Sequence, residues 1–386
     1  MTKAPLHGLR ILDLTTVVMG PYAGQLIGEY GAEVIKIEAP CGDSTRHIGP
    51  GRENGMAGLF MGVNRHKASV VIDLKSHAGR EALLSLVETA DVLMHNMRPN
   101  KMEALGLGPD EIRARNPRLV YASLTGFASD GPYAGQPAYD DVIQGLAGFA
   151  GLMEMQTGVP RYIPAALADK VGSLFAVQAV LTALLQREQT GYGACVEVPM
   201  FEAAVSFGLV EHMQGGQFEP PIEPMGYRRA MMPGRRPYET RDGHVCVMPY
   251  TDSHWQAFLL EVGDTATLED PRFATLSERT RNIELLYTRL AEHILTRSTQ
   301  EWLGVCHRLD IPVAPMNRLE DLRADPHLCA VEHFVTVDDA DMGRLVFPRN
   351  PVRFDGWQSQ PTMPPRLGQD TERVLNAVAR RDGDSR

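Results

Sequence analysis

The chain has 386 residues, of which 44% are hydrophobic and 22% are charged, a composition typical of a folded globular protein with two or three domains. The formal net charge of −10 counts against non-specific binding to nucleic acid or to an anionic membrane surface, although it allows a local basic pocket. No stretch approaches the roughly 20 uninterrupted apolar residues of a membrane span, and the N-terminal residues contain no apolar run of signal-peptide length. We therefore expect a cytoplasmic protein without a membrane span. The five cysteines form no CxxC pair, which favours ordinary thiols over disulfides or a structural zinc site.

Apolar strands and amphipathic helices alternate through the first 125 residues. Strands are predicted over residues 9–15, 32–37, 68–74, 91–97 and 118–124, and helices over 21–30, with Pro21 as the first helical residue, 79–89 and 110–116. Such alternation predicts a mostly parallel sheet that is covered on both faces and binds its ligand beyond the carboxyl ends of the strands.

The first strand–helix–strand unit invites comparison with a dinucleotide-binding site, in which Glu38 would meet a ribose. The glycines count against that interpretation. Gly20, Gly24 and Gly28 recur every four residues, which lines them along one helix face for close packing, whereas a phosphate-binding turn needs GxGxxG.

A long helix is predicted between Pro164 and Gly193, after a Gly- and Pro-rich passage over 126–158 that we expect to be mainly loop. Asp169 stands immediately before the first apolar positions of this helix, which predicts that it is the N-cap residue. Two roles are open on this pattern. Asp169 caps the helix, or it is a nucleophile that the helix dipole and free amides keep ionised at neutral pH.

The second half of the chain indicates a smaller α+β domain that begins near residue 220, after a linker rich in Pro and Gly. Two strands within 238–248 are joined by a turn at Asp242–Gly243, and helices are predicted near 253–262, 280–295 and 299–309. Before them lies a basic cluster without acidic residues, made of Arg228, Arg229, Arg235 and Arg236. It is either a solvated face or an anion-binding site.

Taken together, five segments resemble the class III (CaiB/BaiF-type) acyl-CoA transferases, a family that includes the alpha-methylacyl-CoA racemases. The resemblance runs essentially end to end and is carried by Leu12–Arg46, Asn64–Pro99, Asn116–Phe127, the setting of Asp169, and Thr190–Met200. It implies an α/β fold with a Rossmann-like large domain, formed by residues 1–215 and 329–386, and an inserted small α+β domain, 216–328, in an interlocked homodimer.

The resemblance also implies a chemistry for Asp169, the catalytic nucleophile of the family's transferases. It attacks the donor acyl-CoA to give a mixed anhydride, and then forms an aspartyl-CoA thioester from which an acceptor carboxylic acid takes the CoA. Coenzyme A is a substrate in this scheme, and no cofactor or metal takes part. The partners expected are thus an acyl-CoA, with succinyl-CoA as the candidate donor, and an organic carboxylic acid.

The positions that contact substrate or CoA in the family correspond here to Val17, Val18, Ile72, Lys75, Asn96, Met97, Tyr139, Asp140 and Met200. Two departures concern the nucleotide, because Ala39 and Ala104 replace arginines of the formyl-CoA transferases. Arg98, Lys101 or the basic cluster is therefore expected to hold the CoA phosphates.

Three further differences bear on the substrate. Val18 replaces an active-site glutamine and no GGGG-type loop is present, which disfavours formyl-CoA and oxalate as substrates. Tyr139 stands before Asp140 where the racemase branch has a catalytic histidine, and a tyrosine is a poor acid–base catalyst at neutral pH. CoA transfer is thus favoured, and racemisation of a 2-methylacyl-CoA is the alternative.

Overall fold

The computed structural model describes residues 3–384, without the side chains of Pro99 and of residues 378, 379 and 381–384. Its packing divides the chain into two compact units. The first comprises the chain up to Ala147, Pro164–Phe207, and the chain from Pro326 onward; the second comprises Gly148–Ile163 and Gly208–Asp325. The segment Gly148–Ile163 thus packs with the second unit, which the composition of the chain did not reveal.

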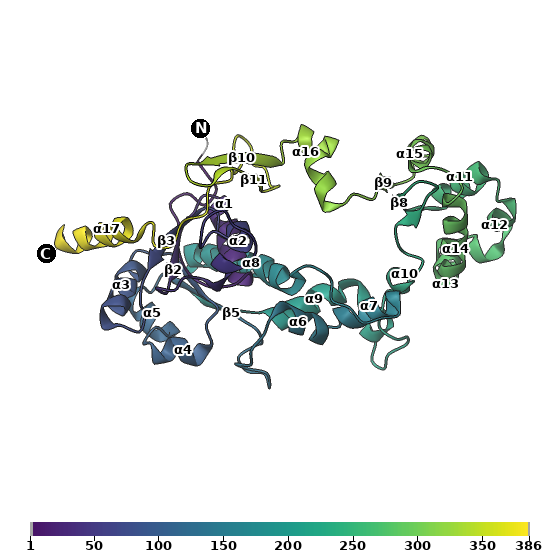
Figure 1. Ribbon diagram of the computed structural model, residues 1–386. Coiled ribbons are helices and arrows are strands. Elements are labelled where there is room, and N and C mark those ends of the chain that lie inside the picture. Colours follow the sequence, from purple (N-terminus) through teal and green to yellow (C-terminus); the bar gives the residue numbers. More distant parts are fainter. Residues whose placement is uncertain (1–2, 385–386) are drawn as a thin grey trace. The chain divides into compact units, whose positions relative to one another are not determined.

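The first unit is built on a six-stranded parallel sheet with strand order β3-β2-β1-β4-β5-β6. Figure 1 labels β2, β3 and β5 of this sheet. Its strands are β1 Arg10–Leu14, β2 Glu33–Glu38, β3 Lys67–Val71, β4 Val92–His95, β5 Val120–Thr125 and β6 Cys195–Pro199. Its helices are α1 Met19–Glu29, α2 Gly58–Val63, α3 His77–Val87, α4 Pro99–Ala104, α5 Pro109–Arg115, α6 Asp140–Leu146, α8 Leu167–Thr190, α16 Pro326–Ala330 and α17 Thr371–Asp384, and α9 Met200–His212 begins there. A hairpin of β10 Phe334–Asp339 and β11 Gly343–Pro348 completes the unit. The expected α/β class with a parallel sheet is confirmed.

Helices cover both faces of the sheet because successive strand residues point to opposite sides. Ile11 of β1 packs into an apolar cluster with residues of α1 and α8, whereas Leu12 packs into a second cluster with residues of α3, α5 and α17. A row of glycines permits the close approach of α1, as the four-residue spacing predicted. A Cβ at Gly20 would lie 2.3 Å from the Cβ of Thr15, and one at Gly24 would lie 2.8 Å from Asp13 Oδ2.

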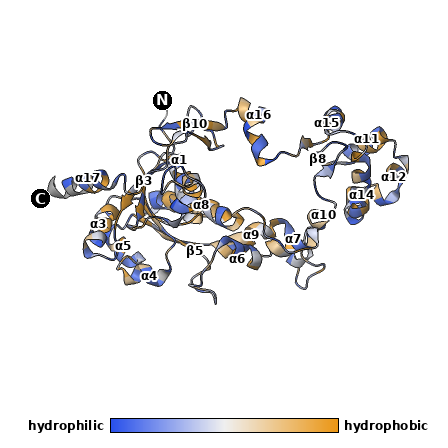
Figure 2. Cartoon of the chain, viewed as in Figure 1, coloured by the Kyte–Doolittle hydropathy of each residue, from blue (hydrophilic) through white to orange (hydrophobic). Residues whose placement is uncertain are grey.

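Helix α8 is hydrophobic along much of its length (Figure 2). Among the described residues it is the one helix long and apolar enough to cross a membrane, which the search for uninterrupted apolar runs did not anticipate. Buried core helices meet the same criterion, and α8 packs against α1 and the sheet through residues such as Val180, Ala183 and Leu184.

The second unit is a separate α+β body. It contains α7 Phe149–Thr157, α10 Arg228–Met231, α11 Asp252–Val262, α12 Thr265–Glu269, α13 Leu276–Arg281, α14 Ile283–Ile294, α15 Thr299–Arg308, and the three-stranded sheet of β7 Tyr238–Glu239, β8 His244–Val247 and β9 Val313–Pro315. Trp255, Phe258 and Trp302 lie at the centre of its own core. The predicted pair of strands and the three longer helices are all present.

Two local predictions were wrong, and one element was not predicted. The passage over 126–158 contains α6 and α7, and Asp140 and Asp141 in the first turn of α6 are a helix-start signal that the glycines obscured. Helix α1 begins at Met19, so Pro21 is its third residue rather than its first. The hairpin β10–β11 was not foreseen.

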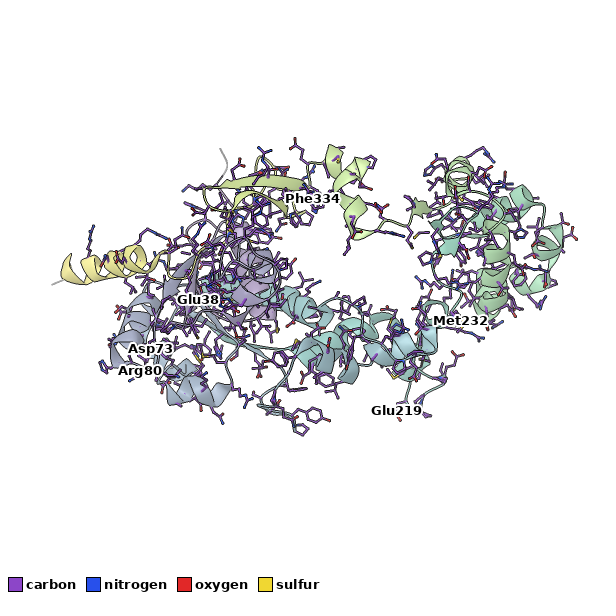
Figure 3. All side chains as sticks on the ribbon, in the orientation of Figure 1. Glu38, Asp73, Arg80, Glu219, Met232 and Phe334 are labelled. Atoms are coloured by element: carbon purple, nitrogen blue, oxygen red, sulfur yellow. The ribbon has the colours of Figure 1, made fainter. Side chains whose placement is uncertain are left out.

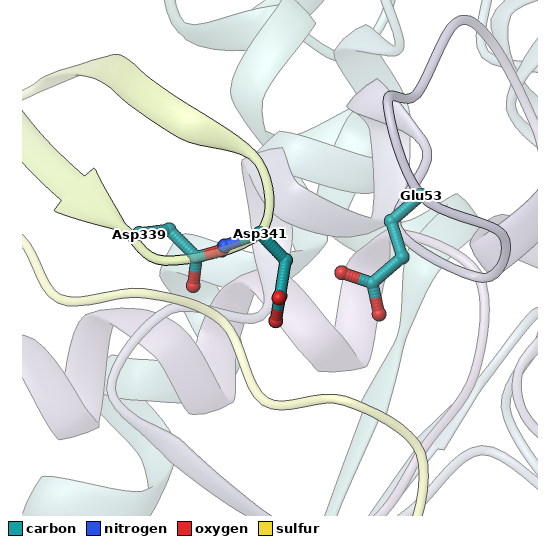
Figure 4. Close-up of side chains that lie close together, drawn as sticks. All are labelled: Glu53, Asp339 and Asp341. Carbon is teal, nitrogen blue, oxygen red and sulfur yellow. The ribbon is translucent and has the colours of Figure 1, made fainter.

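Three carboxylates, those of Glu53, Asp339 and Asp341, lie close together near the turn of this hairpin (Figure 4). Arg366 donates to Glu53 Oε2 at 2.8 Å, to Asp339 Oδ1 at 2.9 Å and to Asp341 Oδ2 at 3.0 Å. The hydrogen bond from Arg366, followed by the backbone N–H of Met342, lowers the pKa of Asp339 to about 2. A guanidinium therefore neutralises part of this cluster and joins the hairpin to the loop that carries Glu53.

Candidate active site

A cavity of about 530 Å³ opens at the carboxyl edge of the parallel sheet, entirely within the first unit. We call it the Asp169 cavity. From β1 the chain adds strands toward one edge of the sheet, and from β4 it adds strands toward the other edge. Open α/β sheets bind ligands in the crevice at such a switch point. Segments after β1, β4, β5 and β6 all contribute to its wall. A larger cavity of about 830 Å³ beside α1, α2 and β11 does not include Asp169, so we take the smaller one as the candidate active site.

Seven of the predicted site residues line this cavity: Val17, Asn96, Met97, Arg98, Tyr139, Asp169 and Met200. The others do not line it. Val18 and Ile72 are buried, Lys75 and Lys101 are exposed, and Asp140 contacts the backbone of Asp169. Sequence reasoning missed several lining residues that no motif marked: Thr16 after β1, Asn100 in α4, Gln136 in the loop before α6 and Glu197 in β6.

Asp169 is not the N-cap of α8. The helix begins at Leu167, its N-cap is Ala166 without a side-chain hydrogen bond, and Asp169 is the third helical residue. The capping hydrogen bond comes from another helix, because the Asp169 N–H donates to Asp140 Oδ1 at 3.1 Å. Gln144 in turn donates to Asp140 Oδ2 at 2.6 Å. The Asp169 side chain is therefore released from capping its own helix.

Burial, and after it the negative charge of Asp140, raises the pKa of Asp169 to about 6. The backbone N–H of Met19 at the start of α1 and the charge of Lys170 act in the opposite direction. We expected the end of the helix to hold the pKa of Asp169 low, but the pKa is raised instead. The prediction of an anion still holds, since a carboxyl of this pKa is ionised in about nine of ten molecules at pH 7. Such a carboxylate is more basic than an ordinary aspartate and so a better nucleophile.

The loop of residues 15–18, which we call the β1–α1 loop, reaches the cavity in a strained conformation. Val17 has a φ of +73°, a left-handed value that costs a β-branched residue about 1–3 kcal/mol. Lys36 Nζ donates to the carbonyl of Thr15 at 2.8 Å, and Asn96 exchanges two hydrogen bonds with the backbone of Thr16. The loop therefore keeps its shape through contacts with β2 and with the segment after β4.

Fully buried ion pairs lie beneath this loop. Lys67 Nζ is 2.7 Å from Asp13 Oδ2, and Lys36 Nζ is 3.0 Å from Asp43 Oδ2. Burial alone would raise the pKa of Asp13 and of Asp43, but the lysine charges and nearby hydrogen bonds outweigh it and leave both lowered. These carboxylates remain ionised and fix the loop from below.

Glu38, labelled in Figure 3, ends β2 and is buried in a pair with Arg46, whose Nη2 is 2.6 Å from Oε1. Ser69 Oγ donates to the same oxygen at 2.7 Å. The side chain that would have met a ribose in a dinucleotide site is thus already occupied by protein partners.

The predicted basic cluster belongs to the second unit and does not form one surface. Arg229 is buried with its guanidinium carbon 4.7 Å from the centre of the Tyr250 ring, whereas Arg228 and Arg236 are exposed. Arg98 is thus the basic side chain in the wall of the Asp169 cavity among the described residues.

The family model of CoA-transferase family III matches residues 6–371. The chain belongs to CoA-transferase family III. It is 34% identical to the probable fatty acyl-CoA transferase Rv3272 of Mycobacterium tuberculosis (97% of this chain, 98% of that one). It is 30% identical to the succinate–glutarate CoA-transferase of Agrobacterium fabrum (97% and 95%). The crystal structure of a CaiB/BaiF family protein from Brucella suis matches with a TM-score of 0.83 and 29% identity over 98% of this chain and all of that one.

These matches confirm the resemblance derived from the five sequence segments and make this family III member an enzyme that transfers CoA. The match also spans both compact units, because the family model extends from the first strand to α17. The role of each cavity residue and the assembly of the chain stay predictions.

Proposed function

We propose that this transferase moves CoA from an acyl-CoA to an organic carboxylic acid through covalent intermediates on Asp169. The observation that carries the proposal is the half-buried carboxylate of Asp169, with a pKa of about 6, in the wall of the Asp169 cavity. Glu197 lines the same cavity but is exposed and accepts a hydrogen bond from Ser129 at 3.0 Å, so it is the weaker candidate.

The chemistry balances without a cofactor. An Asp169 oxygen attacks the donor thioester carbonyl, and CoA leaves as the thiolate, giving an acyl-aspartyl anhydride. The thiolate attacks the aspartyl carbonyl, releases the donor acid and leaves an aspartyl-CoA thioester. The acceptor carboxylate attacks this thioester and displaces the thiolate, which gives a second mixed anhydride between the acceptor and Asp169. The thiolate then attacks the acceptor carbonyl of that anhydride, which forms the new acyl-CoA and frees the Asp169 carboxylate.

The surroundings of Asp169 suit these steps. The Met19 N–H lies at the positive end of α1, where it would stabilise negative charge that develops on the aspartyl carbonyl oxygen. Arg98 would pair with a CoA phosphate or with the free carboxylate of a diacid, because a guanidinium binds either group through two parallel hydrogen bonds.

For the substrates we propose succinyl-CoA as donor and a dicarboxylic acid as acceptor. The relative from Agrobacterium fabrum, named for succinate and glutarate, supports this choice, as does Arg98 in the cavity. The relative named as a probable fatty acyl-CoA transferase makes a long-chain acid the competing outcome.

We further propose that the protein is a cytoplasmic homodimer of interlocked chains. Apolar side chains exposed on neighbouring helices α6 and α8 support an interface: Val142 is 53% exposed, Leu174 58% and Leu185 68%. All five cysteines are free thiols, as is usual in a reducing compartment.

A transfer assay tests the function. Purified protein is incubated with succinyl-CoA and a panel of dicarboxylic, branched and long-chain acids, and the new acyl-CoA is measured by mass spectrometry. Asp169→Asn should abolish transfer, whereas Asp141→Asn, which removes an exposed charge of α6, should retain it. Exchange of the alpha proton in deuterated water without any acceptor acid would instead support the racemase alternative. Near-normal transfer by Asp169→Asn would refute the proposal.

A further inference from the structure

We propose that Asn96 is a positioning residue that holds the β1–α1 loop in the shape needed to bring the Met19 N–H to Asp169. This inference rests on the proposed function, since it assigns a task to a residue of the same site. It also changes the role that the family resemblance implied for Asn96, which was contact with CoA.

The Asn96 carboxamide forms hydrogen bonds with both backbone polar groups of Thr16. The Thr16 N–H donates to Asn96 Oδ1 at 3.0 Å, and Asn96 Nδ2 donates to the Thr16 carbonyl at 2.8 Å. Asn96 follows β4 and Thr16 follows β1, so this pair joins two chain segments across the switch point of the sheet. Both polar atoms of the side chain are therefore already used by the protein in the wall of the cavity.

The residue that follows Thr16 explains why such a pair is needed. Val17 has a φ of +73°, and a left-handed valine persists only where its surroundings impose it. Asn96 fixes the peptide that precedes Val17. The Val17 backbone nitrogen lies 3.5 Å from Asp43 Oδ1, too far for a strong hydrogen bond. Without Asn96 the loop would relax toward a negative φ.

Relaxation at Val17 would reach Asp169 because only Val18 lies between Val17 and Met19. The Met19 carbonyl accepts from Ser173 Oγ at 2.6 Å, which ties the first turn of α1 to α8. The Met19 N–H lowers the pKa of the Asp169 carboxyl. The path from Asn96 to the reacting carboxylate therefore passes through the strained turn, and not through direct contact.

A double-mutant cycle separates positioning from CoA binding. Asn96→Ala removes both hydrogen bonds to Thr16, and we expect kcat to fall about ten- to hundredfold while KM for the acyl-CoA changes less than about threefold. Glycine adopts a positive φ without strain. In a Val17→Gly background, the fold-decrease in kcat caused by Asn96→Ala should therefore be about one fifth, or less, of the fold-decrease that it causes in the wild-type background. Asn100→Ala is the matched control, because Asn100 lines the same cavity and makes no hydrogen bond to the loop among the described residues.

The pH profile gives a second readout. Loss of the Met19 hydrogen bond should move the acidic limb of kcat/KM to higher pH in Asn96→Ala and return it toward the wild-type position in the double variant. Asn96→Asp, which keeps the acceptor for the Thr16 N–H but loses the donor, replaces Asn96→Ala if that variant does not fold.

The inference is overturned if Asn96→Ala raises KM with kcat unchanged, or if its effects multiply independently with those of Val17→Gly. Coupling between Asn100→Ala and Val17→Gly of the same size would overturn it as well. Failure of the proposed function is recognised separately, because wild-type protein would then form no covalent adduct at Asp169 whatever the cycle reports.

Discussion

Replacing Asp140 by asparagine should make Asp169 more acidic. Asp140→Asn removes a negative charge that raises the pKa of Asp169, while its remaining oxygen can still accept the Asp169 N–H, now at 3.1 Å from Asp140 Oδ1. The change also disturbs the hydrogen bond from Gln144 to Asp140 Oδ2. Gln144→Met is therefore the matched control, because it breaks that hydrogen bond and keeps the charge.

The size of the effect follows from the order of its causes. The pKa of Asp169 rises from 3.8 to about 6, burial contributes most, and Asp140 is the second contribution. Removing the second contribution should lower the pKa by about one unit, which corresponds to about 1.4 kcal/mol.

The assay is the dependence of kcat/KM on pH, whose acidic limb reports the group that must be ionised in the free enzyme. Wild-type activity should fall below about pH 6, as Asp169 becomes protonated. In Asp140→Asn the limb should move about one unit lower, and the rate well above pH 7 should drop because the carboxylate is less basic. An acidic limb that stays in place, or that moves equally in Gln144→Met, would refute this account of the pair.

The remaining predictions concern stability, substrate binding and assembly. A carboxyl whose pKa is raised in the folded state destabilises the fold above that pKa and has no effect below its pKa in the unfolded state. Asp169→Asn should therefore stabilise the protein by up to about 3 kcal/mol at pH 8. In denaturant titrations this gain in the free energy of unfolding should disappear between about pH 6 and pH 4. Lys36→Met leaves Asp43 buried without its partner and should cost about 3–5 kcal/mol in the same titrations. Arg98→Ala should raise KM for the acyl-CoA about tenfold or more with little change in kcat, as measured by initial rates, and an unchanged KM would place the phosphates elsewhere. Leu174→Arg should shift the protein from dimer to monomer in analytical ultracentrifugation, and a variant that sediments as the wild type would exclude this face of α8 as the interface.

Periodicity predicted the sheet because the strands are buried on both faces and read as apolar runs, and it located Asp169 at the start of α8. It misplaced that start by three residues, because the N-cap is Ala166 rather than Asp169. Leu167 and Ala168 favour a helix, so α8 begins before the apolar positions from Val171 onward that marked it in the sequence. The Asp169 N–H is satisfied by Asp140 of another helix instead of by a local cap. No pattern along the chain reveals that contact, because the two residues are far apart in sequence.

Other features of the site depend on tertiary structure in the same way. A lysine in a strand, such as Lys36, is usually exposed, yet here it is buried and holds the β1–α1 loop from below. The left-handed turn at Val17 runs against local preference, since valine is among the residues least suited to it. The family resemblance marked Asn96 as part of the site but did not distinguish contact with a ligand from contact with Thr16.

The most direct test of the central claim is to trap the covalent intermediate. The protein is incubated with an acyl-CoA, quenched with hydroxylamine or borohydride, digested and analysed by peptide mass spectrometry. Our account predicts a hydroxamate or a reduced side chain at Asp169 in the wild-type protein and none in Asp169→Asn. A peptide that stays unmodified during turnover with several donors, or a modification at Glu197 instead, would contradict it.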